Sequence, residues 1–136
     1  MLDDIFKFGL HDTRLHDICV DKNDNALLLY FNDGVYSLNE LGKESKLTNK
    51  CVLKIFIDTF YDHEVANHVS INEYSKKNRF LELYDFTILL QKEKVNVGNV
   101  FISFFNHAIL FTSGNSTGTY YIEICDCVKI EYMIKD

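Results

Sequence analysis

Two His-Asp dipeptides, His11-Asp12 and His16-Asp17, lie five residues apart near the start of the chain, with Cys19 just beyond them. Imidazole, carboxylate and thiol groups are the ligands of zinc sites and the reactive groups of many hydrolytic enzymes. The spacing separates the two pairs, because an odd interval places them on opposite faces of a strand and about 140° apart on a helix. We therefore interpret this stretch as the entry to a strand and predict no site within it.

Two further motifs resemble metal sites but do not have their spacing. The stretch "HEVANH" (63–68) is similar to the zinc-protease motif H-E-x-x-H, but its histidines are five residues apart instead of four, which turns His68 off the helical face of His63. Cys125 and Cys127 form a C-x-C pair, and the sequence holds no second pair that would complete a four-ligand zinc site. The sequence thus predicts no catalytic residue, no metal ligand and no cofactor.

The composition is that of a globular protein. Of the 136 residues, 47% are hydrophobic and 25% are charged, which is typical of a folded domain of this length. Because the chain has no proline, no low-complexity segment and no internal repeat, we expect a single domain over residues 1–136. The formal net charge of −6 argues against a nucleic-acid partner, since phosphate binding requires clustered lysine and arginine residues.

The sequence contains no segment typical of membrane insertion or export. Its apolar runs, such as those at 26–31 and 100–105, are far shorter than the roughly 20 residues of a membrane-spanning helix. The first residues, "MLDDIFKFGLHD", are acidic where a secretory signal needs basic residues. We therefore expect a cytoplasmic protein without membrane contact, whose four cysteines remain reduced thiols.

The elements that position these residues are predicted to be mostly strands, because apolar and polar residues alternate. The clearest signal is a β-hairpin over 25–38, in which Asn32-Asp33-Gly34 supplies the positive φ angles of a tight turn. Further strands are expected, in chain order, over 14–21, 51–57, 65–71, 100–105, 108–112, 119–125 and 128–134.

Helical structure is expected in fewer places. Asp85 is placed to cap a short helix over 85–94, whose apolar residues share one face. The overlapping stretch "DHEVANHV" (62–69) can instead form two helical turns after Asp62, and the polar loop over 39–50 has room for one helical turn near its start. The predicted fold class is mainly β (α+β): an antiparallel β-sandwich or partly open barrel with one short helix.

Several predicted strands are apolar on both faces, such as "ALLLYF" (26–31), "CVLKIFI" (51–57) and "VFISFF" (100–105). A second sheet can cover one face of such a strand. The predicted helix, a long loop or a second copy of the protein must then cover the other face. A homodimer is therefore one of the assemblies that the sequence allows.

The N-terminal segment 10–38 resembles the start of small, uncharacterised β-rich bacterial proteins, some of which are grouped with the immunity proteins of contact-dependent toxin systems. The shared pattern is an HD-x-R opening with a hydrophobic residue, a strand, a polar turn, an apolar strand and an F-x-D-G turn. In this sequence the pattern is carried by His11, Asp12, Arg14, Leu15, Phe31, Asp33 and Gly34. The resemblance implies a cytoplasmic binding protein without catalysis, and it assigns no site residues.

The first hypothesis for the function is a non-enzymatic binding protein that recognises a protein partner through an acidic and aromatic surface. It rests on the acidic net charge and on the absence of any catalytic spacing in the sequence. The residues expected on this surface are Tyr61, Asp62, His63 and Glu64.

Two alternatives remain open. One is a small β-barrel or sandwich that binds an apolar ligand in a cavity lined by Phe101, Phe105, Phe111 and Tyr120. The other is a hydrolase-type enzyme in which the fold brings carboxylates within hydrogen-bond reach of two histidines. The five histidines are His11, His16, His63, His68 and His107.

Overall fold

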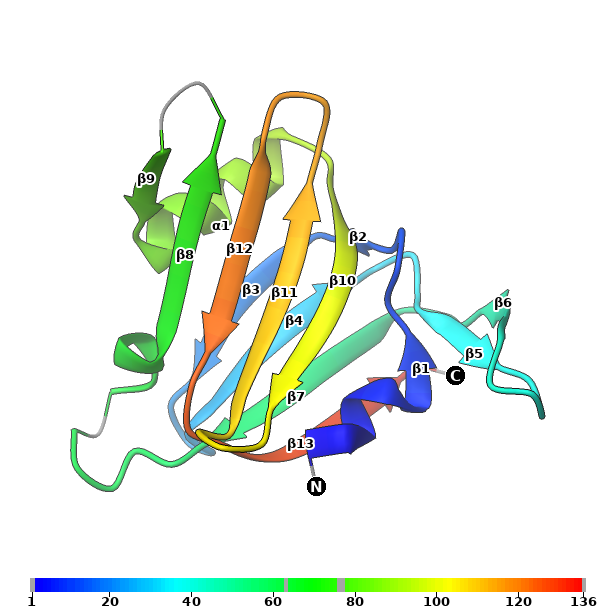
Figure 1. Ribbon diagram of the computed structural model, residues 1–136, viewed down its shortest axis with the longest axis horizontal. Coiled ribbons are helices and arrows are strands. Elements are labelled where there is room, and N and C mark those ends of the chain that lie inside the picture. Colours follow the sequence, from blue (N-terminus) through cyan, green and yellow to red (C-terminus); the bar gives the residue numbers. More distant parts are fainter. Residues whose placement is uncertain (1, 63, 76–77, 136) are drawn as a thin grey trace.

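The computed structural model describes residues 2–62, 64–75 and 78–135. These residues form thirteen strands in three antiparallel sheets, one α-helix and two short 3-10 helices (Figure 1). The strands are β1 (Phe8–Gly9), β2 (Arg14–Leu15), β3 (Asp17–Asp21), β4 (Ala26–Phe31), β5 (Tyr36–Leu38), β6 (Glu44–Leu47), β7 (Cys51–Ile57), β8 (Val69–Tyr74), β9 (Asn78–Leu81), β10 (Val95–Ser103), β11 (Ala108–Gly114), β12 (Thr119–Ile124) and β13 (Cys127–Ile134). The helices are η1 (Leu2–Lys7), η2 (Val65–His68) and α1 (Leu83–Lys92).

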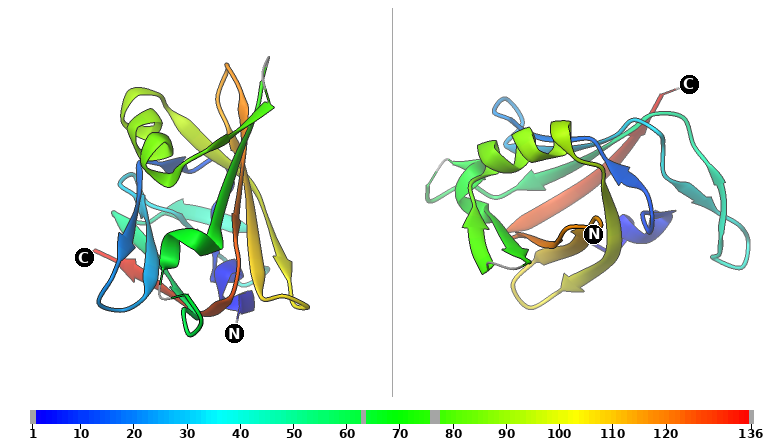
Figure 2. Two further views of the ribbon diagram at one scale, coloured as in Figure 1. Left: turned by 90° about the vertical axis from the view of Figure 1, so that its left-hand side faces the viewer. Right: turned by 90° about the horizontal axis from the view of Figure 1, so that it is seen from above.

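Two large sheets form a sandwich, which confirms the predicted fold class. One has the strand order β2-β10-β11-β12-β8-β9 and the other β13-β7-β4-β3, and neither closes on itself among the described residues. The side view in Figure 2 shows the two sheets facing each other, with α1 at one end of the sandwich. Strand β12 shows the alternation that this packing requires, since Tyr120, Ile122 and Ile124 are buried while Tyr121 and Glu123 face outward.

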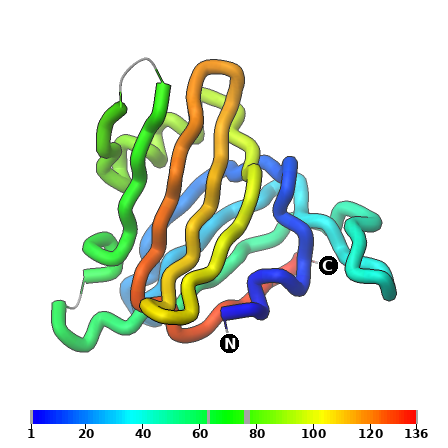
Figure 3. Tube along the Cα trace, in the orientation of Figure 1, coloured from blue at the N-terminus to red at the C-terminus, as the bar shows by residue number. Residues whose placement is uncertain are grey.

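The third sheet, β1-β5-β6, projects from the sandwich at the side opposite β8 and β9, as the chain trace in Figure 3 makes clear. The prediction of a β-hairpin over 25–38 is therefore wrong. Strand β4 pairs with β3 and β7, whereas β5 pairs with β1 and β6. The Gly34 amide donates to Phe31 O at 3.0 Å, so the central residues of this turn are Asn32 and Asp33, and neither has the positive φ that a two-residue hairpin turn requires. The only positive φ of the three residues is that of Gly34, at 89°. Its turn directs the chain out of the sandwich instead of back along β4.

Other elements differ from expectation in position. The helix α1 begins at Leu83, so Asp85 lies in its first turn and does not cap it. The segment 65–71 combines both alternatives, since the 3-10 turn η2 is followed by β8. The polar loop 39–50 contains the strand β6 where one helical turn was expected. No helix among the described residues has the length and apolar character needed to cross a membrane.

Lysine side chains lie across the outer face of the four-stranded sheet, which explains why its inner strands are apolar on both sides. Lys54 lies over the ring of Phe56 at 4.9 Å, and Lys50 lies over the ring of Tyr30 at 5.9 Å. The Lys54 ammonium also contacts the carboxylates of Asp21 and Asp24. The aliphatic stems of the lysines pack on the aromatic rings while their charges remain paired or solvated.

Candidate functional site

The acidic loop, residues 58–64 between β7 and η2, contains the surface predicted from the sequence. Its backbone is held by two side-chain turns. The amide of Phe60 donates to Asp58 Oδ1 at 3.0 Å, and the amide of Glu64 donates to Asp62 Oδ1 at 3.3 Å. Such Asx turns satisfy backbone donors locally and fix a loop that lacks a regular ladder.

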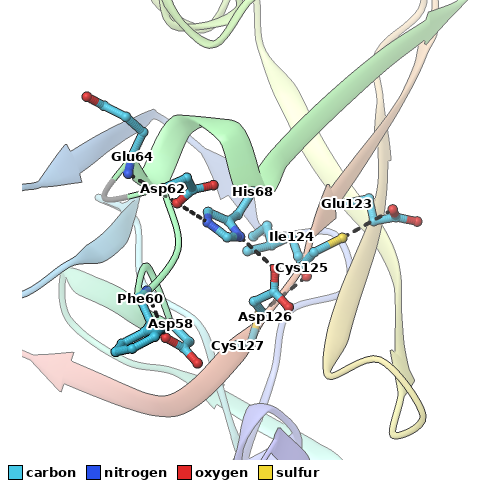
Figure 4. Close-up of polar contacts among 10 residues, drawn as sticks. All are labelled: Asp58, Phe60, Asp62, Glu64, His68, Glu123, Ile124, Cys125, Asp126 and Cys127. Atoms are coloured by element: carbon cyan, nitrogen blue, oxygen red, sulfur yellow. Dashed lines mark hydrogen bonds and ion pairs between the residues drawn. The ribbon is translucent and has the colours of Figure 1, made fainter.

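The side chain of His68, at the end of η2, connects this loop to the turn between β12 and β13. Its Nδ1 lies 2.7 Å from Asp126 Oδ2 and its Nε2 lies 3.0 Å from Asp62 Oδ1 (Figure 4). Because both ring nitrogens face carboxylate oxygens, the imidazolium form, which carries a hydrogen on each nitrogen, is the form that satisfies both contacts. We refer to His68, Asp62 and Asp126 together as the His68 clamp.

The clamp changes the acid–base behaviour of its members. Burial, which leaves 11% of the His68 side chain exposed, opposes the charged ring, but the hydrogen bonds that the ring donates to Asp62 and Asp126 outweigh it and raise the pKa of His68. The hydrogen bond from His68 lowers the pKa of Asp62. With both nitrogens engaged, the ring has no free position from which to accept a proton, so the clamp is suited to holding the loop and not to general base chemistry.

Backbone hydrogen bonds join the acidic loop to two neighbouring turns. The amide of Asp58 donates to Asp126 O at 2.9 Å, the amide of Cys125 donates to His68 O at 2.8 Å, and the amide of Cys127 donates to His107 O at 2.9 Å. Asp126 and His107 both have positive φ angles, 58° and 52°, which let the β12–β13 and β10–β11 turns bend sharply at these contacts. The three segments thus form one connected end of the sandwich, which we call the acidic end.

The thiols at the acidic end are held in the protonated form. Burial raises the pKa of Cys127 to about 12. Burial together with the hydrogen bond to Glu123 raises the pKa of Cys125 to about 11. A thiol is a nucleophile or a metal ligand only as the thiolate, so neither cysteine has the character of a reactive one. No group of three or more metal-ligating side chains occurs among the residues described in the structure.

Lysine and arginine are absent from the segments that supply the acidic end. None of the 14 lysine and arginine residues lies within 55–75 or 95–128, the segments that supply the acidic loop and both turns. Six carboxylates are found in these segments, and four of them, those of Asp58, Asp62, Glu64 and Asp126, belong to the acidic loop and the β12–β13 turn. Clustered charge of one sign produces a local potential that attracts ligands of the opposite sign.

The four predicted site residues differ in their exposure and in their contacts. The Tyr61 side chain is 93% exposed and forms an edge-to-face pair with Phe60, itself 73% exposed, at 5.0 Å between ring centres. Glu64 is exposed as expected, Asp62 is engaged by His68, and His63 lies outside the described residues. The sequence analysis missed Phe60, Asp58 and Asp126 as members of the site. His68 was considered in the "HEVANH" stretch, for metal chemistry, and among the five histidines of the hydrolase-type alternative, but no sequence pattern indicated its contacts with Asp62 and Asp126.

The remaining candidate residues are dispersed over the molecule. His11 lies 3.3 Å from Asp12 and contacts Gly98 O, whereas His16 Nδ1 accepts the amide hydrogen of Asn32. The two dipeptides therefore make separate contacts in different parts of the molecule. The four aromatic residues expected to line a ligand cavity are divided, since Phe111 and Tyr120 are in the core while Phe101 and Phe105 are exposed.

Comparisons of the chain with protein-family models, with curated proteins and with solved structures found no match.

Proposed function

We propose that this protein is a non-enzymatic binding protein of the immunity-protein type, which recognises a basic partner protein through the acidic loop. The observation that carries the proposal is the exposed Phe60–Tyr61 pair within the segment 55–75, whose sequence contains carboxylates and no lysine or arginine. Aromatic side chains supply most of the binding free energy at protein interfaces, and complementary charge supplies association rate and specificity.

The fixed shape of the acidic loop supports the same proposal. The Asx turns of Asp58 and Asp62 and the His68 clamp constrain the backbone at Phe60, Asp62 and Glu64 without any partner. A loop that is already ordered loses less conformational entropy on binding than a mobile one. The arrangement also leaves both aromatic rings exposed while their backbone is secured, as a preformed docking element requires.

A cytosolic location is part of this proposal. All four cysteines are unpaired thiols. The pKa values of Cys51, Cys125 and Cys127 are raised, and burial is the main cause in each case. Thiols kept in this form suit a reducing compartment.

A homodimer is a further expected assembly, and the outer face of the six-stranded sheet supports it. A shallow cavity of about 480 Å³ on this face is lined by seven residues, of which only Glu123 is charged. Tyr74 and Tyr121 stand there as an edge-to-face pair, partly exposed. Two acidic molecules meet most readily where each presents aromatic groups and little charge. Sedimentation equilibrium should detect a dimer that Tyr121→Lys dissociates and Tyr84→Lys, on α1, does not.

The binding function is tested by quantitative capture from a native lysate of the organism that encodes the protein. The immobilised protein should retain one or a few basic proteins, and Tyr61→Ser should reduce their recovery at least about tenfold, the effect of losing a central aromatic contact. Phe80→Ser is the matched control, because Phe80 is an equally exposed aromatic residue on β9. Capture should also decrease as the salt concentration is raised.

Glu64→Lys, compared with Glu40→Lys in the β5–β6 turn, tests the charge contribution. Equal recovery of the captured proteins by the Tyr61 variant, the Glu64 variant and their controls would contradict the proposal.

A further inference from the structure

A cavity of about 340 Å³ lies at the acidic end beside the His68 clamp. Its lining comes from η1, from the end of β7 and from the β10–β11 and β12–β13 turns. The lining residues are Leu2, Asp58, Phe104, His107, Asp126, Cys127 and Val128. The volume is at the lower end of the roughly 300–1,000 Å³ range of ligand pockets, so it suits a single side chain better than a large cofactor.

The cavity combines apolar walls with two carboxylates. Leu2 and Cys127 are buried, whereas Phe104 and Val128 are largely exposed and leave their apolar surfaces open to an entering group. One oxygen of each carboxylate is already bonded, Asp58 Oδ1 by the Phe60 amide and Asp126 Oδ2 by His68. The second oxygens, Asp58 Oδ2 and Asp126 Oδ1, accept no hydrogen bond from the described part of the chain. They are therefore available to a donor brought by a ligand.

The walls of this cavity are fixed by the contacts that join the acidic end. The Asp58 amide donates to Asp126 O, and the Cys127 amide donates to His107 O, so three of the contributing segments are tied to one another. Among the described residues, the lining holds two carboxylates, one histidine and no lysine or arginine, and His68 pairs with one of the carboxylates, Asp126, from beside the cavity. The cavity is thus an apolar recess in which Asp58 supplies a carboxylate that is not paired with a cation among the described residues.

We infer that this cavity binds the guanidinium group of an arginine side chain presented by the partner protein. A guanidinium carries several N–H donors in a plane, which matches two carboxylate oxygens contributed from different segments. Its weakly hydrated faces stack on aromatic rings, for which Phe104 is placed. Lysine has a compact, strongly hydrated ammonium and fits an apolar recess less well. This inference rests on the proposed function, because it names the part of the partner that the acidic end recognises.

The test uses the full-length protein and a small probe, without any partner. N-acetyl-arginine amide is titrated into ¹⁵N-labelled protein at about pH 7.5, where an ordinary imidazole with a pKa of about 6.5 is mostly neutral. We expect chemical-shift changes concentrated at residues 104–107 and 125–128, with weak, saturable binding. The corresponding citrulline derivative, which has nearly the same shape but no charge, should produce no saturable change.

Asp58→Asn is the decisive variant, because its amide oxygen can still accept the Phe60 amide while the negative charge is lost. The affinity for the arginine probe should fall by up to about fivefold, which is the upper end of the effect expected for one exposed carboxylate. Glu40→Gln removes the same charge at a distant exposed turn and should leave the affinity unchanged.

Four results would overturn the inference: no site-specific shift with the arginine probe, equal binding of the citrulline derivative, equal or tighter binding of N-acetyl-lysine amide, or unchanged affinity in Asp58→Asn. Each is independent of the capture experiment. A protein that captures partners through Tyr61 but does not bind the probe would retain the proposed function and lose only the arginine cavity. A protein that binds the probe but captures no partner would retain the arginine cavity and lose the proposed function.

Discussion

At the scale of single residues, His68 determines how the acidic loop is held, because its ring is the only side chain that contacts both Asp62 and Asp126 among the described residues. We expect His68→Gln to lower the free energy of unfolding by about 1–2 kcal/mol, the usual contribution of hydrogen bonds to a charged group. Urea denaturation measures this change. Chymotrypsin should also cleave after Phe60 or Tyr61 faster in the variant. His107→Asn, which tolerates the positive φ of that position, is the control.

The same substitution should have a defined pH dependence. The pKa of His68 is raised from its ordinary 6.5, so its contribution to stability is complete below that value and is lost as pH rises through the folded-state pKa. The pKa of Asp62 is lowered from 3.8, so its contribution is present above 3.8 and is lost as pH falls through the lower folded value. The difference between wild type and His68→Gln should therefore be largest between about pH 4 and 6.5. A difference independent of pH would show that the clamp is uncharged.

The cysteines give a second prediction at this scale. Burial raises the pKa of Cys51 to about 11 and that of Cys127 to about 12, so both thiols are protonated at ordinary pH and shielded from solvent. Iodoacetamide applied to the native protein at about pH 8 should leave both unmodified, since alkylation requires the thiolate. Peptide mass spectrometry locates the label, and urea-unfolded protein provides the fully labelled reference. Rapid native labelling of Cys127 would contradict the burial seen here.

At the scale of elements, the turn after β4 decides which sheet the chain enters next. Gly34 has a φ of 89°, and a methyl group on its Cα would overlap the carbonyl oxygen of Thr48. Gly34→Ala should therefore lower the free energy of unfolding by about 3 kcal/mol or more. Gly42 has a φ of 74° but nothing near its Cα, so Gly42→Ala should cost only about 1 kcal/mol of backbone strain. Thermal denaturation distinguishes the two, and equal losses would show that the Thr48 contact is unimportant.

The elements also show what sequence patterns can and cannot reveal. Local alternation was sufficient for β12, because its residues face the core at every second position, whereas β7 was recognisable as a continuous apolar run. Local patterns did not predict which strands pair with β5. The Asn-Asp-Gly turn before β5 does not specify which strand lies beside β5. Near Val128 the alternation also breaks, because a register shift between Cys127 and Lys129 leaves Val128 exposed.

The candidate site was only partly predictable for the same reason. His68 and Asp126 are 58 residues apart in the sequence and meet because β8 pairs with β12, with Val69 opposite Ile124. No local pattern specifies that register. The surface at Tyr61 and Glu64 could be predicted because exposure of a polar, aromatic loop depends on neighbouring residues alone. The cavity beside it depends on four separate segments and has no signature in any one of them.

At the scale of the whole molecule, the separation of charge predicts how the protein meets other molecules in solution. The acidic end lies in segments without lysine or arginine, whereas positive side chains occur elsewhere in the chain. A cationic nitroxide in solution should therefore broaden the amide signals of residues 58–62, 104–107 and 125–128 more than a neutral nitroxide does. Added salt should reduce this difference, since about 0.15 M salt screens exposed charges beyond roughly 8 Å. Equal broadening by both probes would show that the carboxylates produce no local potential.

The third sheet projects from the sandwich on the side away from the acidic loop, and its β5–β6 turn is fully exposed. Leu41 at its tip is 81% exposed, and Gly42 has open space around it. A biotin or fluorescent dye coupled at this ribbon, after Leu41→Cys, would act as a handle that keeps the opposite surface unobstructed. Molecules immobilised in this way would all present the same end to the solution, which suits them to sensor-based measurements.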